Sequence, residues 1–238
     1  MLLFREKIPA DWLPKVLADL PAVLVDHAHL ERKAATTALN LEKYRDLYPR
    51  VEELNGIAIE ELQHFQLVLN LLKVRGIPFG QPYPSPWISG LMKSIRNGQR
   101  RQVIDHLICC SLIEGRSCEK FQILARELEP IDPVLAKFYA SLVESEGNHY
   151  AAYLLMARTI DDAETDRRLD FYLDLDAKLI RKSNPLPMLH SITGDSLRKQ
   201  HVNAPDRGSP TARECLRKLC PALLHRPHPG RESAGWPG

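Results

Sequence analysis

Two copies of a Glu-x-x-His pattern constrain the fold of this chain more than any other feature of its sequence. The first copy is Glu61 to His64, the second is Glu146 to His149, and both lie in long runs typical of helices. A helix stacks residues three apart on one face, one turn from each other. A single copy is common on helix surfaces. Two copies, each with a further Glu on the preceding helix, form the ligand set of a di-metal helical bundle.

The two halves of the chain repeat this arrangement. Glu31 precedes Glu61 by 30 positions, Glu114 precedes Glu146 by 32, and a proline-containing turn lies between them in each half. Because a helix rises about 1.5 Å per residue, each Glu and its partner pair lie at similar heights on adjacent antiparallel helices. The sequence thus predicts two matching hairpins whose six polar side chains meet in one centre.

Helical periodicity and proline or glycine breaks divide the first 190 residues into a small set of helices. The predicted fold class is all-α: a four-helix bundle with one long crossover, flanking short helices and a C-terminal helix. Asp132 is expected to cap the fourth bundle helix, with Pro133 in its first turn. The bundle helices are expected at residues 22–47, 50–74, 100–129 and 133–159, the short helices at 12–20 and 88–96, and the C-terminal helix at 163–182.

The composition changes after residue 190. Residues 191–238 contain six Pro and five Gly with little apolar periodicity, so we predict one helical domain over residues 1–190 and a disordered tail over 191–238. This tail holds eight Lys/Arg against four Asp/Glu, which gives it a charge of +4, whereas the whole chain carries +2. The helical domain is therefore slightly acidic, and overall basicity is no argument for nucleic-acid binding.

The cysteines and the N-terminus indicate where the protein works. Five cysteines, an odd number without a Cys-x-x-Cys pair, are typical of reduced thiols rather than of a disulfide framework. The N-terminus becomes charged at Arg5, too early for a secretory signal, and no apolar run reaches membrane-spanning length. We therefore expect a cytoplasmic protein with no membrane partner.

The six side chains of the predicted centre suit two divalent metal ions. Four carboxylates cancel the four positive charges of two such ions, whereas four buried carboxylates without metal would repel one another. Carboxylate and imidazole ligands favour iron or manganese over a structural zinc, which takes thiolates. Two adjacent irons with open positions can bind O2 and reduce it to an oxidant that attacks a C–H bond. The predicted metal ligands are Glu31, Glu61, His64, Glu114, Glu146 and His149.

Two other hypotheses use the same residues differently. In a ferritin-like metal-handling or peroxide-scavenging protein, the centre stores metal or removes peroxide rather than hydroxylating a substrate. The lack of a Cys-x-x-Cys pair counts against a rubrerythrin-type scavenger. In a metal-free helical scaffold, the same glutamates and histidines are solvated surface charges. The matched spacing of the two halves favours the di-metal centre over the scaffold.

Four neighbours of the predicted ligands are candidates for supporting them. Cys110 and Cys118 lie four residues before and after the third glutamate, and small buried residues that narrow the cavity are a simpler interpretation than redox groups. His27 lies four residues before the first glutamate, where it either supports that ligand or is a structural histidine. Tyr150 directly follows the second histidine. A radical role is conceivable there, but core packing is the simpler interpretation.

A basic stretch in the crossover and at the start of the following helix is a candidate for binding RNA. It has no acidic residue between positions 76 and 104, and aromatic residues lie close by. Such a segment can grip a phosphate backbone and stack a base, but a solvated helix start explains it equally well. The candidate substrate-binding residues are Lys93, Arg96, Arg100 and Arg101.

With these residues in place, the first 190 residues resemble the bacterial tRNA-(2-methylthio-N6-isopentenyladenosine) hydroxylases, the MiaE-type non-haem di-iron monooxygenases. The resemblance rests on motifs that are specific in combination and that cover four of the helices. They are Trp12-Leu13, Asp26-His27-Ala28-His29-Leu30-Glu31-Arg32-Lys33-Ala34-Ala35, Glu60-Glu61-Leu62-Gln63-His64-Phe65, Leu112-Ile113-Glu114-Gly115-Arg116-Ser117-Cys118-Glu119 and Glu144-Ser145-Glu146-Gly147-Asn148-His149-Tyr150.

This resemblance implies O2-dependent hydroxylation of the isopentenyl group on the modified adenosine at position 37 of certain tRNAs. It also implies a ferritin-like fold in which the six predicted ligands hold two iron ions. The tRNA is expected to present its anticodon loop, and a separate donor such as a ferredoxin or a flavoprotein reductase is expected to supply electrons. The tail from about residue 191 departs from the compact ending of that family.

Overall fold

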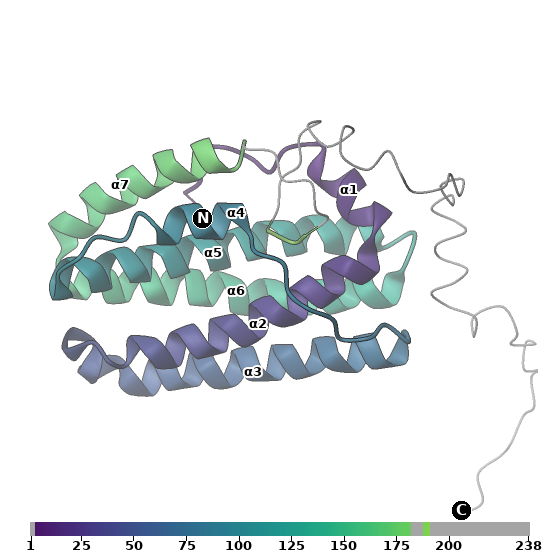
Figure 1. Ribbon diagram of the computed structural model, residues 1–238, viewed down its shortest axis with the longest axis horizontal. Helices are drawn as coiled ribbons and strands as arrows, with labels where there is room; N and C mark the ends of the chain where they lie inside the picture. The colour runs from purple at the N-terminus through teal and green to yellow at the C-terminus, as the bar shows by residue number, and fades with distance from the viewer. Residues whose placement is uncertain (1–2, 182–187, 191–238) are drawn as a thin grey trace, which may run out of the picture. The chain divides into compact units, whose positions relative to one another are not determined.

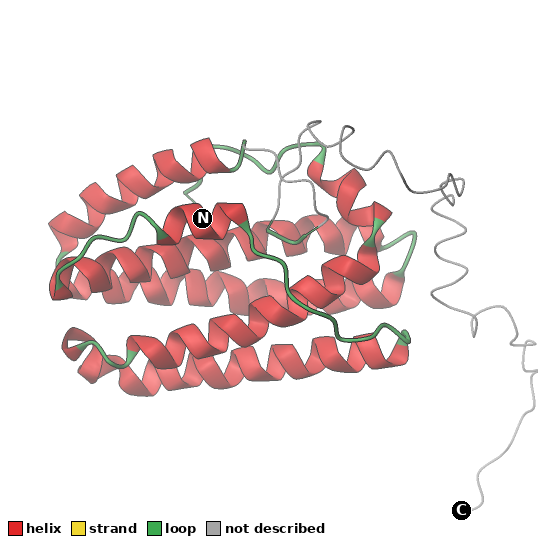
Figure 2. Ribbon diagram, in the orientation of Figure 1, coloured by secondary structure: helices red, strands yellow, loops and turns green. Residues whose placement is uncertain are grey.

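The computed structural model describes residues 3–181 and 188–190, in which all the regular secondary structure is helical (Figures 1 and 2). These residues belong to the first of two compact units, Met1–Ala204, and the second unit, Pro205–Gly238, lies outside the described part. The predicted tail over residues 191–238 also lies outside it. The four long helices are α2 (Leu20–Leu41), α3 (Val51–Val74), α5 (Gln99–Leu128) and α6 (Pro133–Ile160).

The long helices pair as the two predicted hairpins. Helix α2 packs along α3, and α5 packs along α6. The connection that follows α3 crosses α2 before it enters a short helix (Figure 1), so the crossover joins the hairpins as expected. The all-α bundle with one long crossover is thereby confirmed. The shorter elements are α1 (Trp12–Ala18), the 3-10 helix η1 (Arg45–Arg50), α4 (Pro86–Met92) and α7 (Asp162–Leu179).

Aspartates at helix starts fix where several elements begin. The side chain of Asp132 accepts a hydrogen bond from the Leu135 N–H, and Pro133 occupies the first turn of α6, as predicted. Asp161 caps α7 in the same way by accepting from the Glu164 N–H. A side-chain oxygen at this position satisfies one of the backbone N–H groups that a helix start leaves without a partner.

Two of the predicted helices differ from the observed ones by more than three residues at one end. The helix expected at residues 22–47 ends at Leu41, because the backbone of Tyr44 is extended and η1 follows as a separate turn. This break lets Tyr44 and Leu47 both enter the core. The short helix expected at residues 88–96 begins instead at Pro86, because Ser85 caps it through the Ile88 N–H, and it ends at Met92.

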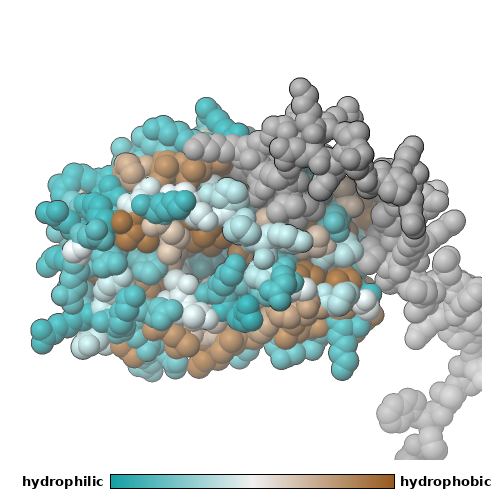
Figure 3. Space-filling model, viewed as in Figure 1, coloured by the Kyte–Doolittle hydropathy of each residue, from teal (hydrophilic) through white to brown (hydrophobic). Residues whose placement is uncertain are grey.

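The apolar core consists of two clusters of buried residues. One includes side chains of α5, α6 and α7 with Trp87, and the other surrounds Trp12, Phe121 and Tyr139. The face that carries α2 and α4 mixes hydrophilic and hydrophobic residues (Figure 3). Within the described residues, no helix has the length and apolarity needed to cross a membrane.

Candidate metal centre

The six predicted ligands converge inside the bundle. All six side chains are buried, and the most exposed of them, His64, has a relative accessibility of 7%. Four carboxylates buried in one place require compensating positive charge, because an unpaired buried charge costs several kcal/mol. One ligand comes from α2, two from α3, one from α5 and two from α6, in the order Glu31, Glu61 and His64, Glu114, Glu146 and His149.

The two histidines lie among the carboxylates. His64 Nδ1 is 3.5 Å from Glu31 Oε2, 3.8 Å from Glu61 Oε2 and 3.7 Å from Glu146 Oε1. His149 Nδ1 is 2.7 Å from Glu61 Oε1. Four of the residues, one from α2, two from α3 and one from α6, each offer a ligand atom within 4.8 Å of the others. Glu61 therefore faces both imidazoles from the middle of the group.

Four polar atoms at this centre are buried without a hydrogen-bond partner in the described part of the structure. They are Glu61 Oε1, His64 Nδ1, Glu146 Oε1 and His149 Nδ1. The close pair Glu61 Oε1 and His149 Nδ1 is not aligned for a hydrogen bond, so both atoms face the same space. Buried polar atoms without partners are costly. Ligation of metal by these atoms removes that cost, so the residues present fit a metal centre.

The electrostatics of the centre favour added positive charge. Burial and the nearby Glu61 carboxylate raise the pKa of Glu114 to about 8 and the pKa of Glu146 well above its usual value. Burial opposes a charged imidazole, yet the carboxylates of Glu31 and Glu61, 3.5 and 3.8 Å from His64 Nδ1, raise the pKa of His64 to about 10. In the absence of metal, protons on Glu114, Glu146 and His64 reduce the negative charge of the centre. A bound divalent ion can take the place of these protons.

His27 contacts the centre through one of the predicted ligands. Its Nε2 is hydrogen-bonded to Glu31 Oε1, and its ring stacks on Tyr139 with the ring centroids 5.6 Å apart. Burial alone would raise the pKa of Glu31, but the charge and hydrogen bond of His27 hold that pKa below its usual value. The structure thus gives His27, which is fully buried, a contact with a predicted ligand as well as a place in the core.

Glu60 and Ser145 also contact the predicted ligands, and the sequence assigned neither a role. His149 Nε2 lies 2.8 Å from Glu60 Oε2, and Ser145 Oγ lies 3.3 Å from His64 Nε2. Both contacts run between α3 and α6, so no spacing within a single helix signals them. Each contact fixes the orientation of an imidazole whose Nδ1 faces the centre.

A cavity of about 500 Å³ adjoins the centre. Its size lies in the range of small-molecule binding sites. Four of the predicted ligands, Glu31, Glu61, Glu114 and Glu146, are on its wall, and Leu189 and His190 close part of it. The remaining wall includes the apolar or weakly polar side chains of Ile88, Met92, Cys110, Ile113 and Tyr153.

The predicted supporting residues differ in whether they reach this cavity. Cys110 lines it, whereas the Cys118 thiol points toward the Val143 carbonyl, 3.4 Å away. Burial raises the pKa of both thiols, which agrees with small buried side chains rather than reactive thiolates. Tyr150 packs against Phe4 with ring centroids 6.5 Å apart. Its neighbour on the helix face, Tyr153, lines the cavity instead.

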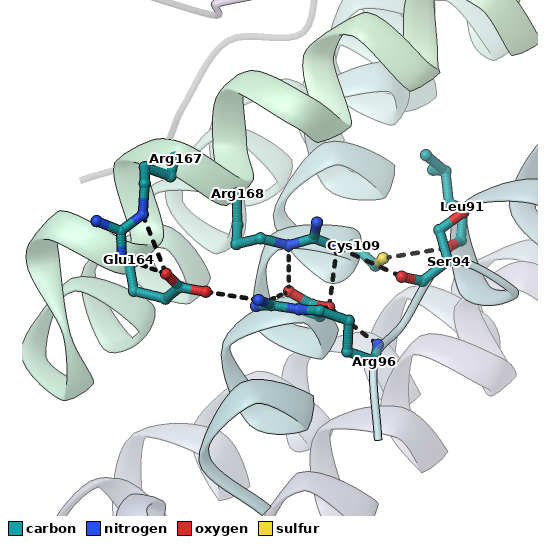
Figure 4. Close-up of polar contacts among 8 residues, drawn as sticks. Leu91, Ser94, Arg96, Cys109, Glu164, Arg167 and Arg168 are labelled. Carbon is teal, nitrogen blue, oxygen red and sulfur yellow. Dashed lines mark hydrogen bonds and ion pairs between the residues drawn. The ribbon is translucent and has the colours of Figure 1, made fainter. Parts of the chain in front are cut away.

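The predicted basic patch divides into one partly buried side chain, Arg96, and three exposed ones. Of the exposed ones, Arg100 donates to the Ile160 carbonyl oxygen and lies 4.0 Å from Asp161 Oδ2. Arg96 donates to Asp105 at 2.8 and 2.9 Å and to Glu164 at 2.6 Å, and Figure 4 shows the link to Glu164 on α7. Its charge is therefore matched by acids, and it ties the crossover to α5 and α7. Arg100 and Arg101 are exposed and line a separate pocket that also includes Asp161 and Glu164.

Lys93 is exposed at the end of α4. For Lys93, Arg100 and Arg101, a contact with substrate stays a prediction. The guanidinium of Arg96 is already paired with Asp105 and Glu164, so it is less able to bind a phosphate than the sequence predicted.

Comparison with known proteins gives this centre a family. Residues 2–191 match the family model described as tRNA-(MS[2]IO[6]A)-hydroxylase (MiaE). The tRNA 2-(methylsulfanyl)-N(6)-isopentenyladenosine(37) hydroxylase of Pseudomonas putida is 35% identical over 185 residues, which are 77% of this chain and 89% of that protein. The hydroxylase of the same name from Salmonella typhimurium is 38% identical over 121 residues, 51% of this chain and 44% of that protein.

A solved structure shares the fold. It is described as Protein 43 with aldehyde deformylating oxygenase activity from Synechococcus, with a TM-score of 0.71 and 30% sequence identity, and the match covers 82% of this chain and 98% of that one. The ferritin-like bundle expected from the sequence is confirmed by this likeness. Because the family model spans most of the chain and the Pseudomonas relative is similar over most of its length, the chain belongs to the MiaE family of tRNA hydroxylases.

Proposed function

We propose that this protein is an O2-dependent non-haem di-iron monooxygenase. Its proposed substrate is 2-methylthio-N6-isopentenyladenosine at position 37 of tRNA, which it hydroxylates on the isopentenyl group. The observation that carries the proposal is the convergence of four glutamates and two histidines, with unpaired buried ligand atoms, beside a cavity. The names of the similar hydroxylases supply the substrate. They also favour this activity over the metal-handling or peroxide-scavenging alternative.

The proposed ligand set balances the charge of two ferrous ions. Four carboxylates carry four negative charges and two neutral imidazoles complete the set, so a centre with two Fe²⁺ is neutral overall. A di-iron group supplies the capacity to activate O2 with two electrons from an external donor, for which we propose a ferredoxin or a flavoprotein reductase. The proposed iron ligands are Glu31, Glu61, His64, Glu114, Glu146 and His149.

The protein side chains around the ligands hold them in place. Glu60 and Ser145 orient the two imidazoles, and His27 holds one oxygen of Glu31. Such partners also strengthen the ligands as donors, because a hydrogen bond to the far ring nitrogen makes an imidazole more basic. The cavity wall excludes bulk water from the reacting group, which protects a strong oxidant from side reactions.

The cavity is the proposed place of the isopentenyl group. The prenyl chain is apolar, and Ile88, Met92 and Ile113 offer it an apolar wall that ends at the carboxylates. Burial of each CH2 group contributes roughly 0.8 kcal/mol. The adenosine at position 37 therefore has to leave the stack of the anticodon loop so that its side chain enters the protein. We place the reaction in the cytoplasm, where tRNA is modified, and retain Lys93, Arg100 and Arg101 as proposed outer contacts for RNA phosphates.

The test is mass spectrometry of nucleosides from tRNA of a strain that makes the isopentenyl adenosine but lacks the hydroxylase. With the protein, a reductant system and O2, the modified nucleoside should gain the mass of one oxygen. Glu61→Ala and His149→Ala should abolish this gain and lower the bound iron well below two per chain. Glu144→Ala, which changes an exposed carboxylate on the same helix as His149, is the matched control and should retain both. Full iron binding by both ligand variants, or no oxygen gain with the iron-loaded wild type, would contradict the proposal.

A further inference from the structure

Two basic side chains stand at the rim of the cavity. Arg32 and Lys33 directly follow the proposed ligand Glu31 on α2, and both line the cavity while being exposed to solvent. Glu31 points into the centre and is buried. A single helical turn therefore carries a proposed metal ligand inward and two positive charges outward.

An exposed aromatic ring lies next to these charges. Phe79, in the crossover, has a relative accessibility of 43% and stacks on His29 with ring centroids 4.4 Å apart and an angle of 29°. The guanidinium of Arg32 lies 5.9 Å from the centroid of the same ring and donates to His29 Nδ1 at 3.1 Å. One face of Phe79 is thus supported by protein, and the ring remains partly open to solvent.

The crossover is fixed to α2 at this point. His29 Nε2 lies 2.8 Å from the Gly80 carbonyl oxygen, and Phe79 also packs near Phe65 with ring centroids 6.0 Å apart. In Figure 1 the connection between α3 and α4 passes across α2. Phe79, Arg32 and Lys33 therefore lie on elements that contact each other. A ligand can bind these side chains without first ordering a loop.

We propose that His29, Arg32, Lys33 and Phe79 form a rim surface that binds the anticodon loop of the substrate tRNA. Arg32 and Lys33 bind backbone phosphates, and Phe79 stacks an unpaired base next to the one whose isopentenyl group enters the cavity. This inference rests on the proposed function and names the surface through which its substrate is held.

The chemistry of the rim surface fits a single-stranded RNA loop. Proteins recognise such loops by stacking unpaired bases on aromatic rings and by pairing phosphates with Lys and Arg. At the other candidate site, Arg100 and Arg101 share their pocket with Asp161 and Glu164, and those acids repel phosphate. The rim surface also adjoins the cavity of the metal centre, so a base held there brings its neighbour to the reacting group.

The test measures binding of iron-loaded protein to an anticodon stem-loop RNA that carries the isopentenyl adenosine, over a range of salt concentrations. The double variant R32Q/K33Q should bind at least tenfold more weakly. The negative slope of log K against log salt should become less steep by about 1.4, roughly 0.7 for each phosphate of a single-stranded loop that the variant no longer pairs. The control R126Q/K137Q removes two exposed positive charges outside the cavity lining and should bind as the wild type does.

Stacking is tested separately. Phe79→Ala should weaken binding by about tenfold with an unchanged salt slope, because removal of one base–aromatic stack costs roughly 1–3 kcal/mol, and Phe79→Trp should restore it. Iron content and melting temperature are measured for each variant. Lys33→Gln alone replaces the double variant if loss of Arg32 disturbs the fold. If R32Q/K33Q and Phe79→Ala both bind the RNA as tightly as the wild type does, the proposal that the rim surface binds tRNA is wrong. A wild type that neither binds nor hydroxylates this RNA overturns the proposed function instead.

Discussion

Glu60 is the clearest case of a side chain that matters to the centre without pointing into it. Its carboxylate is 47% exposed and holds His149 Nε2, while His149 Nδ1 faces the ligands. We predict that Glu60→Gln lowers the affinity for iron by about 10- to 100-fold, because removal of a partner that orients a ligating histidine has this typical cost. Competition for iron with a chelator measures the change.

The matched control for Glu60→Gln is Glu144→Gln, since Glu144 is an exposed carboxylate on α6 that does not line the cavity. It should leave iron affinity unchanged. Because Glu60 is half exposed, its replacement should alter the free energy of unfolding of the metal-free protein very little. Equal iron affinity of the two variants would show that His149 is held by its packing alone.

Lys120 is a buried base away from the ligands, and it makes stability depend on pH. Its Nζ lies 3.2 Å from His190 Nδ1 and near the rings of Trp12 and Trp87. Burial, with the nearby charge of Arg116, lowers the pKa of Lys120 to about 7. Between that pKa and its usual value near 10.5 the unfolded chain binds one more proton than the folded chain. The free energy of unfolding should therefore rise with pH in this window.

We predict that Lys120→Met removes this dependence. Relative to the variant, the wild type should gain about 1.4 kcal/mol of unfolding free energy per pH unit between about pH 7 and 10. Below about pH 7 the difference between the two proteins should be constant. Urea unfolding of both proteins across this range measures it, and Lys137→Met, which changes an exposed lysine, is the control. A wild type and Lys120→Met variant with parallel pH profiles would refute the lowered pKa.

At the scale of elements, the start of α6 combines a helix cap with an ion pair. Asp132 accepts from the Leu135 N–H at 3.0 Å and pairs with both terminal nitrogens of Arg75, at 2.6 and 3.1 Å, from the end of α3. The pair is largely buried, with side-chain accessibilities of 8% for Arg75 and 12% for Asp132. It therefore joins the two hairpins at one end of the bundle.

We predict that Asp132→Ala lowers the free energy of unfolding by at least about 3 kcal/mol, because it removes a cap worth about 1 kcal/mol and leaves the largely buried Arg75 guanidinium without its partner. Asp161→Ala removes the cap of α7 and should cost only about 1 kcal/mol. Burial would raise the pKa of Asp132, but the hydrogen bonds of Arg75 hold it below its usual value. The stabilisation by the ionised Asp132 carboxylate is therefore fully present above its usual pKa of 3.8 and is lost as pH falls through the lower pKa of the folded state. Denaturation at about pH 7 and at about pH 3 tests both statements, and an unchanged difference at the lower pH would contradict the second.

Features that depend on the pattern within one helix were predicted from the sequence, whereas features that depend on contacts between helices were not. Helices α3, α5 and α6 were predicted because their periodicity and their proline and glycine breaks lie within each segment. The end of α2 was missed because it depends on Tyr44, whose hydroxyl lies 3.5 Å from His106 Nδ1 on α5, 62 positions away. The six convergent side chains followed from spacing within helices. The contact of Glu60 with α6 depends on how two helices pack, and no pattern in either helix contains that information.

At the scale of the whole molecule, a short segment after α7 closes the cavity. The Leu189 N–H donates to Asp26 Oδ2 at 2.9 Å, and Trp12 Nε1 donates to the Leu189 carbonyl at 3.2 Å. Ser85 donates to the His190 carbonyl at 2.9 Å. Residues near the end of the matched family region thus contact α1, α2 and the start of α4. Because Leu189 and His190 line the cavity, this segment forms part of the cavity wall.

Two truncations separate the contribution of this segment from that of the residues C-terminal to it. A chain that ends after Gly194 keeps all of these contacts, so we predict that it keeps full iron binding and the stability that Met188 and Leu189 contribute. A chain that ends after Arg181 lacks Met188 and Leu189, both almost fully buried. It should be less stable by at least about 3 kcal/mol, since burial of each such side chain contributes roughly 1.5–3 kcal/mol. Urea denaturation of the two chains measures the difference.

The point variant Leu189→Ala in the full chain checks the same idea without truncation. Deletion of a buried leucine side chain costs roughly 2–5 kcal/mol when the surroundings cannot collapse around the space. Leu189 borders a cavity, where the surroundings leave room to relax, so we expect a cost near the lower end of that range. It should be accompanied by faster release of iron to a chelator, because the opened wall admits water to the centre. If Leu189→Ala and the chain that ends after Arg181 were both as stable as the wild type, residues 188–190 would not contribute to the stability of the bundle, and this explanation would be wrong.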